Sequence, residues 1–537
     1  MSAAASPLVE LYDTTLRDGA QGEAVAFAVA EKLEAARLLD SLGLDFIEGG
    51  WPGANPRDSE FFARAKQELR LERARLTAFG STAHPASPVD ADANLRALLA
   101  AETAVVTIFG KSWTLHVREA LGISHGANLQ LIEASVAFLR RAGREVIFDA
   151  EHFFDGYAAD AEYALSVLRA AEAGGAGRLV LCDTNGGSLP SHIAAATRRA
   201  GEAIRLPLGI HTHNDCDLAV ANALAALNAG ASHVQGTFNG WGERCGNANL
   251  ASLLPILALK FSPPRADGLY LERLTPVAAR LAELAGLAQN HRLPFVGASA
   301  FAHKGGIHAS AVRKNPQTYE HVPPGAVGNR RRILVSDQSG RANVLEKAAA
   351  LGFDLTPEQA RDITAEIKAS EHEGYEWEAA DASLELWLRR RLEPRPPAFQ
   401  PLRFAVRSQA EGREGRSRAE VWLQIAGQEV SAQAEGRGPV AALDAALRNA
   451  LAGHHPSVAG VVLADYQVRI LEGQHGAQAR VRVKLTSTYA VDGEDAAPWV
   501  TIGASDNILE ASWEALTDAL QFHLLRAAAA PGLQAAR

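Results

Sequence analysis

Short β-rich runs alternate with longer amphipathic segments along the first half of the chain, from residue 8 to about residue 260. The β-rich runs are Leu8–Tyr12, Asp45–Gly49, Arg75–Gly80, Ala104–Phe109, Glu145–Ala150, Arg178–Cys182, Pro207–Thr212 and His233–Phe238. Segments with apolar residues at helical spacing lie between them, including Ala28–Leu42, Leu129–Ala142 and Leu218–Ala229. Eight strand–helix units in a row favour a closed parallel (β/α)8 barrel, or TIM barrel, over an open doubly wound sheet. We therefore expect an α/β fold in which residues 1–270 form this barrel.

Two different patterns follow the barrel segment. Residues 271–392 are predicted to be a mainly helical subdomain, with Leu274–Leu287 and Pro357–Ser370 as its clearest helices. The proline-rich stretch from Glu393 to Pro401 is predicted to be a stiff linker. Residues 400–537 then show β-like alternation, for example in Ala419–Ile425 and Arg480–Leu485.

The C-terminal region shows the same arrangement twice, in which strands precede a glycine-containing loop and a helix. Gly436–Val440 leads into Ala441–Leu451, and Gly503–Asn507 leads into Ile508–Leu520. We expect an α+β domain with an internal pseudo-repeat. Because this domain offers no obvious catalytic residue, it is predicted to be regulatory, binding an effector or pairing subunits.

The composition limits the class of partner. A net charge of −9 over 537 residues argues against nucleic acid or an anionic membrane as the main partner. There is no run of eighteen apolar residues, so no membrane-spanning helix is predicted. The segment Met1–Pro7 lacks the basic stretch and apolar core of a signal peptide. The three cysteines form no Cys-x-x-Cys pair, so we expect a cytoplasmic protein with reduced thiols.

Two histidines at the end of one predicted strand form half of a possible metal site. His211 and His213 follow the apolar run 206–210, and alternation along a strand turns both side chains to the same side. A lone His-x-His is more often a polar strand end than a ligand pair. Here, however, Asp18 and Asn247 also follow predicted strands, and a parallel barrel gathers such strand ends in one mouth.

Asp18, His211, His213 and Asn247 would together supply two nitrogens and two oxygens. That donor set suits Zn²⁺, Mn²⁺ or a related divalent ion, with positions left open for substrate. Cys245 is a softer candidate, since a thiolate would favour zinc.

Three motifs carry a resemblance to a known family. They are Asp13-Thr-Thr-Leu-Arg17-Asp18-Gly19, His211-Thr-His213-Asn-Asp and Gly242-Glu243-Arg244-x-Gly246-Asn247. Together they resemble the signatures of the 2-isopropylmalate, homocitrate and citramalate synthases, which are metal-dependent acyl-CoA condensing enzymes with a TIM barrel. The resemblance covers nearly the whole chain, including a C-terminal regulatory domain. Residues 47–56 and 149–157 look like the pyruvate-using branch, the (R)-citramalate synthases.

The resemblance implies a Claisen-type condensation of acetyl-CoA with a 2-oxo acid, followed by hydrolysis of the thioester. In this branch the oxo acid is pyruvate and the product leads towards isoleucine. The family's divalent ion (Zn²⁺, Mn²⁺ or Mg²⁺) would be held by Asp18, His211, His213 and Asn247, which places Cys245 below Asn247 as a ligand. Arg17 would stabilise the alkoxide that forms on the ketone oxygen. Alternatively, Arg17 forms a structural ion pair with Glu48 or Glu243.

Four further residues match family positions. The resemblance implies that Glu151 contacts substrate or helps to deprotonate the acetyl methyl group, although it could be a solvated loop carboxylate. Thr184 would hydrogen-bond the oxo-acid carboxylate, although an Asp-Thr after a strand is as often a helix cap. His308, with His303 before it, would be a general acid or base that commonly enters the site of a neighbouring subunit, which implies a homodimer. Tyr319 lies near the spacing of a family tyrosine credited with proton transfer.

This chain departs from the family's pattern at one point. Ala309-Ser310 replaces an acidic residue that often follows the histidine at position 308, which puts a His–carboxylate relay in doubt. In addition, no glycine-rich phosphate motif of the Walker or dinucleotide type is present. The contacts of acetyl-CoA are therefore not assigned from the sequence.

Several alternatives stay open at this point. The same chemistry on a larger oxo acid would make the chain a 2-isopropylmalate or homocitrate synthase. Phe79 or Phe109 at a strand end would favour small pyruvate, but each could be ordinary barrel packing. Acyl-CoA lyases and biotin-dependent carboxyltransferases share the barrel, although lyases lack the long C-terminal domain. A pure effector sensor would not need these metal-ligand types beside an arginine. The pathway implied by the resemblance makes isoleucine the expected allosteric effector.

Overall fold

The computed structural model describes residues 8–393, 396–411, 414–471, 479–491, 494–495 and 498–529. It divides into two compact units: the chain up to Phe301 together with Glu320–Arg331, and Ala302–Tyr319 together with the chain from Arg332 onwards. The domain limits expected from the sequence, 1–270, 271–392 and 400–537, stay predictions. The segment Met1–Pro7 and residues 394–395 of the expected linker lie outside the described residues.

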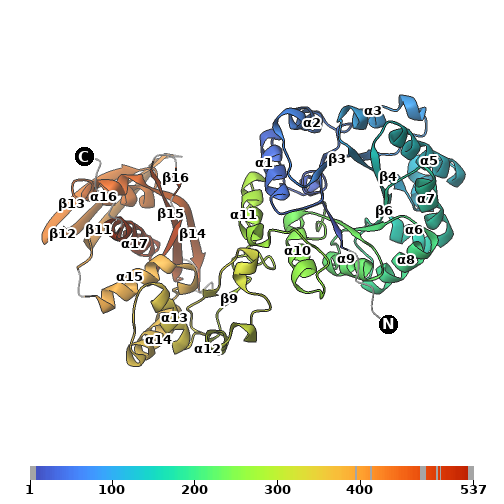
Figure 1. The fold of residues 1–537 in the computed structure, drawn as a ribbon. Helices are drawn as coiled ribbons and strands as arrows, with labels where there is room; N and C mark the ends of the chain where they lie inside the picture. The colour runs from blue at the N-terminus through green and yellow to red at the C-terminus, as the bar shows by residue number, and fades with distance from the viewer. Residues whose placement is uncertain are drawn as a thin grey trace. The chain divides into compact units, whose positions relative to one another are not determined.

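Eight parallel strands close into a barrel in the first unit, in the order β1 to β8, with β8 pairing back to β1 (Figure 1). The strands are β1 (Glu10–Asp13), β2 (Phe46–Gly50), β3 (Arg75–Ser81), β4 (Val105–Lys111), β5 (Glu145–Glu151), β6 (Arg178–Asp183), β7 (Leu208–Thr212) and β8 (His233–Gly236). Each overlaps one of the β-rich runs of the sequence, so the predicted TIM barrel is confirmed.

Helices follow the strands and cover the outside of the barrel (Figure 1). They are α1 (Val29–Asp40), α2 (Pro56–Glu68), α3 (Ala93–Ala100), α4 (Thr114–His116), α5 (His125–Arg141), α6 (Phe153–Ala159), α7 (Ala161–Ala173), α8 (Pro190–Ala203), α9 (Ala219–Asn228), α10 (Leu250–Leu259) and α11 (Leu274–Leu284). None of the described helices is long and apolar enough to cross a membrane.

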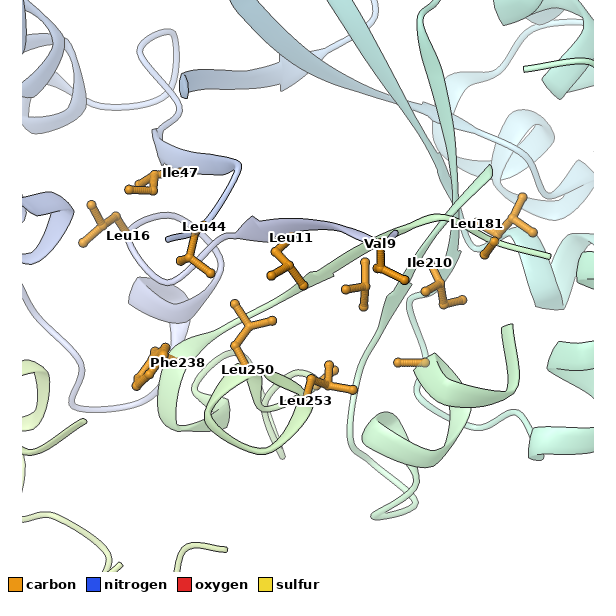
Figure 2. Close-up of a cluster of buried hydrophobic side chains, with 14 of the residues drawn as sticks. Val9, Leu11, Leu16, Leu44, Ile47, Leu181, Ile210, Phe238, Leu250 and Leu253 are labelled. Carbon is orange, nitrogen blue, oxygen red and sulfur yellow. The ribbon is translucent and has the colours of Figure 1, made fainter. Parts of the chain in front are cut away.

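Alternation along the strands separates two apolar clusters. Leu11 on β1 belongs to the large cluster between strands and helices, where Figure 2 shows it near Leu250 and Leu253 of α10. The next residue, Tyr12, points the other way and joins a small cluster with Phe46 and side chains of β4, β5 and β6. Successive side chains of a strand face opposite sides, so the barrel interior is filled from every second position.

The second unit begins with helices and two short strands. Its first elements are β9 (Ala302–His303), α12 (Gly306–Lys314), β10 (Arg332–Ile333), α13 (Arg341–Ala350), α14 (Pro357–His372) and α15 (Asp381–Leu392). α13, α14 and α15 share a small buried cluster that includes Val344, Ile363 and Leu384.

Two antiparallel sheets, each with its own helix, complete the second unit. The first sheet is β11 (Gln400–Glu411), β12 (Glu414–Ile425) and β13 (Gln428–Gly436), followed by α16 (Pro439–Ala452). The second is β14 (Val461–Ile470), β15 (Val481–Val491), β16 (Glu494–Asp495) and β17 (Trp499–Ser505), followed by α17 (Ile508–Ala529). α16 follows a loop that contains Gly438, as the sequence predicts, whereas Gly503 lies within β17 and only Asp506 and Asn507 separate that strand from α17. The expected α+β domain is therefore confirmed, with its arrangement of strands and helix occurring twice.

Candidate active site

Asp18, His211 and His213 meet at the carboxyl ends of the barrel strands. Their ligand atoms lie within 4.8 Å of one another, and all three residues are buried. The Oδ2 atom of Asp18 is 3.2 Å from Nε2 of His211 and 4.0 Å from Nε2 of His213. Because β1 and β7 lie on either side of β8 in the closed barrel, residues far apart in the sequence converge here.

Asn247 joins this group through the backbone. It forms an isolated antiparallel bridge with His213, and its Nδ2 donates to the carbonyl of Trp241 at 3.1 Å. Its Oδ1 is buried and has no hydrogen-bond partner among the residues that the structure describes. The loop needs glycine at Gly246, where φ is +86° and a Cβ would lie 1.9 Å from the Gly240 carbonyl oxygen. A buried carboxylate, two imidazoles and an unpaired amide oxygen fit the donor set of a divalent ion.

Gln235 on β8 orients one of the two imidazoles. Its Oε1 lies 2.8 Å from Nδ1 of His211, and its Nε2 donates to Oδ1 of Asp149 at 3.1 Å. An amide oxygen can only accept, so Nδ1 of His211 carries a proton and Nε2 faces Asp18. Burial alone would lower the pKa of His211, but the Asp18 carboxylate raises it. A partner of this kind fixes the ring orientation of a metal-binding histidine.

Arg17 lies between two carboxylates. Its Nε donates to Oε1 of Glu48 at 2.5 Å, and its Nη1 is 3.3 Å from Oδ2 of Asp18. Glu48 is fully buried and also accepts from the hydroxyls of Tyr12 and Thr14. Burial would lower the pKa of Arg17, but Glu48 and Asp18 raise it, so the guanidinium stays cationic. Of the two glutamates considered as ion-pair partners of Arg17, Glu48 is the one that pairs with it in the structure.

Charge pairing also sets the protonation of the candidate ligands. Burial alone would raise the pKa of Asp18, but Arg17 and the neighbouring imidazoles hold it well below its usual range. Burial and the nearby His211 lower the pKa of His213 to about 4. Both side chains are therefore in their unprotonated forms at neutral pH, as metal binding requires.

These side chains border a cavity of about 190 Å³ at the mouth of the barrel. It is lined by Arg17, Asp18, Gln21, Trp51, Phe79, Phe109, Asp149, Glu151, Cys182, Thr184, His211, His213, Glu243 and Arg244. Seven of the nine predicted site residues thus lie at one place, since Asn247 adjoins His213 and the other six line the cavity. Cys245 is exposed and does not belong to the ligand cluster.

Glu151 and Thr184 lie on the far side of the cavity from the short β1. Glu151 ends β5 and forms an ion pair with Lys111, its neighbour at the end of β4, so it is a paired carboxylate rather than a solvated one. The hydroxyl oxygen of Thr184 accepts the backbone N–H of His152 at 2.9 Å. Thr184 caps no helix, because α8 begins six residues later at Pro190.

His308 and Tyr319 belong to the second unit. Both side chains are exposed, and their ring centres are 4.2 Å apart. His308 lies on α12, and the following residue, Ala309, is buried. Tyr319 thus packs on the imidazole of His308.

Gln235, Lys111 and Trp51 are site residues to which the sequence analysis assigned no role. One feature of the sequence could have identified Gln235 as a site residue. It is a polar residue two positions from His233, on the inward side of a buried strand. Lys111 could be recognised as a site residue only from the strand register, which places it beside Glu151.

Three family models match the chain in succession. Residues 8–279 match the HMGL-like model, residues 295–374 match the homocitrate synthase post-HMGL domain-like model, and residues 378–524 match the LeuA allosteric (dimerisation) domain. The HMGL-like segment contains the whole barrel and all the residues of the cavity.

Several named proteins are similar to this chain over almost its full length. The (R)-citramalate synthase of Synechocystis sp. is 49% identical over 529 residues, which are 96% of both chains. That of Aquifex aeolicus is 47% identical over 96% of this chain and 98% of the relative. A probable 2-isopropylmalate synthase of Methanopyrus kandleri is 32% identical over 94% of this chain and 96% of its own length. The chain belongs to the HMGL-like family and, within it, to the group of (R)-citramalate synthases.

Proposed function

We propose that this protein condenses acetyl-CoA with pyruvate and hydrolyses the thioester to give (R)-citramalate and CoA. The observation that carries the proposal is the buried cluster of Asp18, His211 and His213 beside Arg17, in a chain whose full-length relatives are (R)-citramalate synthases. A 2-isopropylmalate or homocitrate synthase is less well supported, since the relative with the former name is 32% identical against 41–49% for five citramalate synthases.

A divalent ion, Zn²⁺, Mn²⁺ or Mg²⁺, held by Asp18, His211, His213 and Asn247 would act as a Lewis acid on the carboxylate and ketone oxygens of the oxo acid. Arg17, fixed by Glu48, places a positive charge where negative charge develops on the ketone oxygen. The cavity of about 190 Å³ suits a small oxo acid with the acetyl group beside it.

Thr184 is ready to bind the substrate carboxylate. Its oxygen already accepts the N–H of His152, so its own proton is free to be donated. We assign to this O–H a hydrogen bond with the oxo acid. His152 adopts a left-handed backbone conformation, with φ at +56°, which costs about 1–2 kcal/mol for a residue with a side chain and turns its N–H towards Thr184.

Glu151 is the candidate base for the acetyl methyl group. Its carboxylate borders the cavity and is held by the ammonium group of Lys111 at the end of β4. His308 and Tyr319 are the candidate acid–base pair from the second unit. We infer that they act in the site of a neighbouring subunit of a homodimer, since the LeuA model that matches residues 378–524 is a dimerisation domain.

Regulation by isoleucine is the proposed task of the C-terminal domain, in agreement with the allosteric character of the matching model. Ile508, Leu509 and Trp513 on α17 are the residues proposed to line an apolar slot for the isoleucine side chain. Ile508 is 44% exposed, whereas Trp513 packs on Phe404 with ring centres 5.4 Å apart. Ile508 is therefore the most accessible of these residues to a ligand. Millimolar isoleucine should inhibit the full chain more strongly than leucine does; equal indifference to both would reject this effector. We place the protein in the cytoplasm, where its exposed free thiols of Cys216 and Cys245 stay reduced.

Release of CoA thiol from acetyl-CoA in the presence of pyruvate tests the proposed function. Citramalate should accumulate in step with the thiol. Thiol release that does not depend on pyruvate would be plain thioesterase activity and would contradict it.

A further inference from the structure

Three aromatic side chains form one wall of the cavity. Trp51 follows β2, Phe79 lies on β3 and Phe109 lies on β4. The indole meets both phenyl rings edge-on, at 5.7 Å and at angles of 84° and 83°. The two phenyl rings stack on each other with their centres 5.6 Å apart. We name these three residues the aromatic wall.

The aromatic wall lies on a different arc of the barrel from the candidate metal ligands. The ligands come from β7 and from the loops after β1 and β8, which are consecutive in the closed barrel, whereas the wall comes from β2 to β4. Arg17 joins the two sides, because its guanidinium carbon is 3.6 Å from the centre of the Phe79 ring. A 2-oxo acid whose polar end faces Arg17 and the ligands therefore turns its alkyl group towards the aromatic wall.

Trp51 also lines a second cavity of about 380 Å³. The two cavities share Arg17, Gln21 and Trp51. The second cavity is lined by apolar side chains, among them Leu16, Val25 and Phe27, and also by the polar residues Lys32, Asn55, Arg57 and Asp58. The indole is the large apolar group common to both cavities, so it acts as a partition between them.

Hydrogen bonds hold the indole in place. Its Nε1–H donates to Oδ1 of Asn94 at 2.7 Å, and Nδ2 of Asn94 donates to the carbonyl of Ser81 at 2.7 Å. The backbone N–H of Trp51 donates to Oδ2 of Asp58 at 2.8 Å. Asn94 fits because position 80 is glycine, where a Cβ would lie 2.8 Å from its Oδ1. Swinging the indole aside would break its bond to Asn94 and leave a partly buried donor unpaired.

We propose that Trp51, positioned by Asn94, sets the upper size limit for the alkyl group of the 2-oxo acid. This inference rests on the proposed condensation and names the residue that selects its substrate. A methyl group fits in front of the indole, whereas ethyl and isopropyl groups collide with it. Each added carbon in an apolar pocket changes kcat/KM by roughly 10–200-fold, so one fixed ring is enough for strong selection.

The test compares kcat/KM for pyruvate, 2-oxobutyrate and 2-oxoisovalerate in the wild type and in Trp51→Ala, followed by CoA-thiol release. Trp51→Ala joins the two cavities. It should raise the kcat/KM for 2-oxoisovalerate relative to that for pyruvate at least tenfold. Trp51→Phe should raise the kcat/KM for 2-oxobutyrate relative to that for pyruvate by a smaller factor. This variant is the one to measure if Trp51→Ala fails to fold. Trp422→Ala is the matched control, since it removes an indole from β12 that lines neither cavity.

Asn94 is tested through the same ratios. Asn94→Ala should relax selectivity, and Asn94→Asp, which keeps an oxygen for the indole N–H but loses the donor to the Ser81 carbonyl, should relax it less. Unchanged ratios in folded, active Trp51→Ala or Trp51→Phe protein would overturn the proposal. Relaxation in Trp422→Ala would overturn it as well. A wild-type protein that prefers a larger oxo acid would contradict the proposed function. The change in the kcat/KM ratios of the Trp51 variants would still show whether the aromatic wall limits the size of the alkyl group.

Discussion

Nδ1 of His211 lies 2.8 Å from Oε1 of Gln235, which leaves Nε2 of His211 directed at Asp18. The two contacts, one at each ring nitrogen, hold the imidazole in one orientation. Gln235 is held in turn by Asp149, whose pKa burial raises to about 7. This buried chain of polar groups links the barrel interior to the proposed metal site.

Gln235→Leu should weaken divalent metal binding by about 10–100-fold, because His211 loses the acceptor that fixes its ring. Equilibrium dialysis against buffered Zn²⁺ or Mn²⁺ measures the affinity directly. Gln235→Glu keeps an acceptor opposite Nδ1 and should stay closer to the wild type. Equal affinities in the wild type and the leucine variant would remove Gln235 from the account of the site.

Arg17→Lys should lower kcat by about 10²–10³-fold and change the KM for pyruvate much less. Lysine keeps the charge but loses the planar fork that spans Glu48 and Asp18, so the charge is misplaced for the transition state. Steady-state kinetics separate the two constants. Arg64→Lys, at an exposed arginine on α2, is the control. A rise in KM alone would make Arg17 a binding residue.

Mixing two inactive variants tests whether His308 acts across subunits. Asp18→Ala lacks a metal ligand and His308→Ala lacks the candidate acid or base, so a heterodimer would contain one complete site. Partial activity should therefore appear after subunit exchange. Exchange can be followed with differently tagged chains. Confirmed exchange without recovered activity would place His308 in the site of its own subunit or outside catalysis.

The stability of the second unit should fall as the pH rises from about 4.5 to about 7. Glu514 accepts the hydroxyl of Tyr375 at 2.6 Å, and burial raises the pKa of its carboxyl to about 7. The folded state thus binds more protons than the unfolded state in this window, and the stabilisation present at low pH is lost as Glu514 ionises, at a cost of about 3 kcal/mol.

Glu514→Gln stays neutral and should flatten this part of the pH profile, as measured by urea or thermal unfolding at pH 5 and pH 8. Glu510→Gln, at an exposed glutamate on the same helix, should keep the wild-type slope. Parallel profiles for the wild type and Glu514→Gln would show that the carboxyl titrates normally.

The barrel could be predicted because each strand is a short apolar run bounded by polar residues, and the candidate ligands could be predicted because they lie at the ends of such runs or in the polar loops after them. His211 and His213 illustrate this, since two-residue periodicity alone turns them to one side. The side chains that contact these residues could not be predicted from the sequence. Lys111 meets Glu151 through strand register, and Asn94 reaches Trp51 across 43 positions of sequence. Such contacts depend on how helices and strands pack in three dimensions.

The most direct test of the central claim is the rate of CoA-thiol release from acetyl-CoA with pyruvate, 2-oxoisovalerate and 2-oxoglutarate, before and after removal of divalent ions by a chelator. The account predicts that pyruvate is the preferred oxo acid and that (R)-citramalate forms in equal amount to the thiol. It also predicts that activity is lost on chelation and restored by a divalent ion in the wild type but not in Asp18→Ala. Full activity in chelated protein, or a clear preference for 2-oxoisovalerate or 2-oxoglutarate, would contradict it.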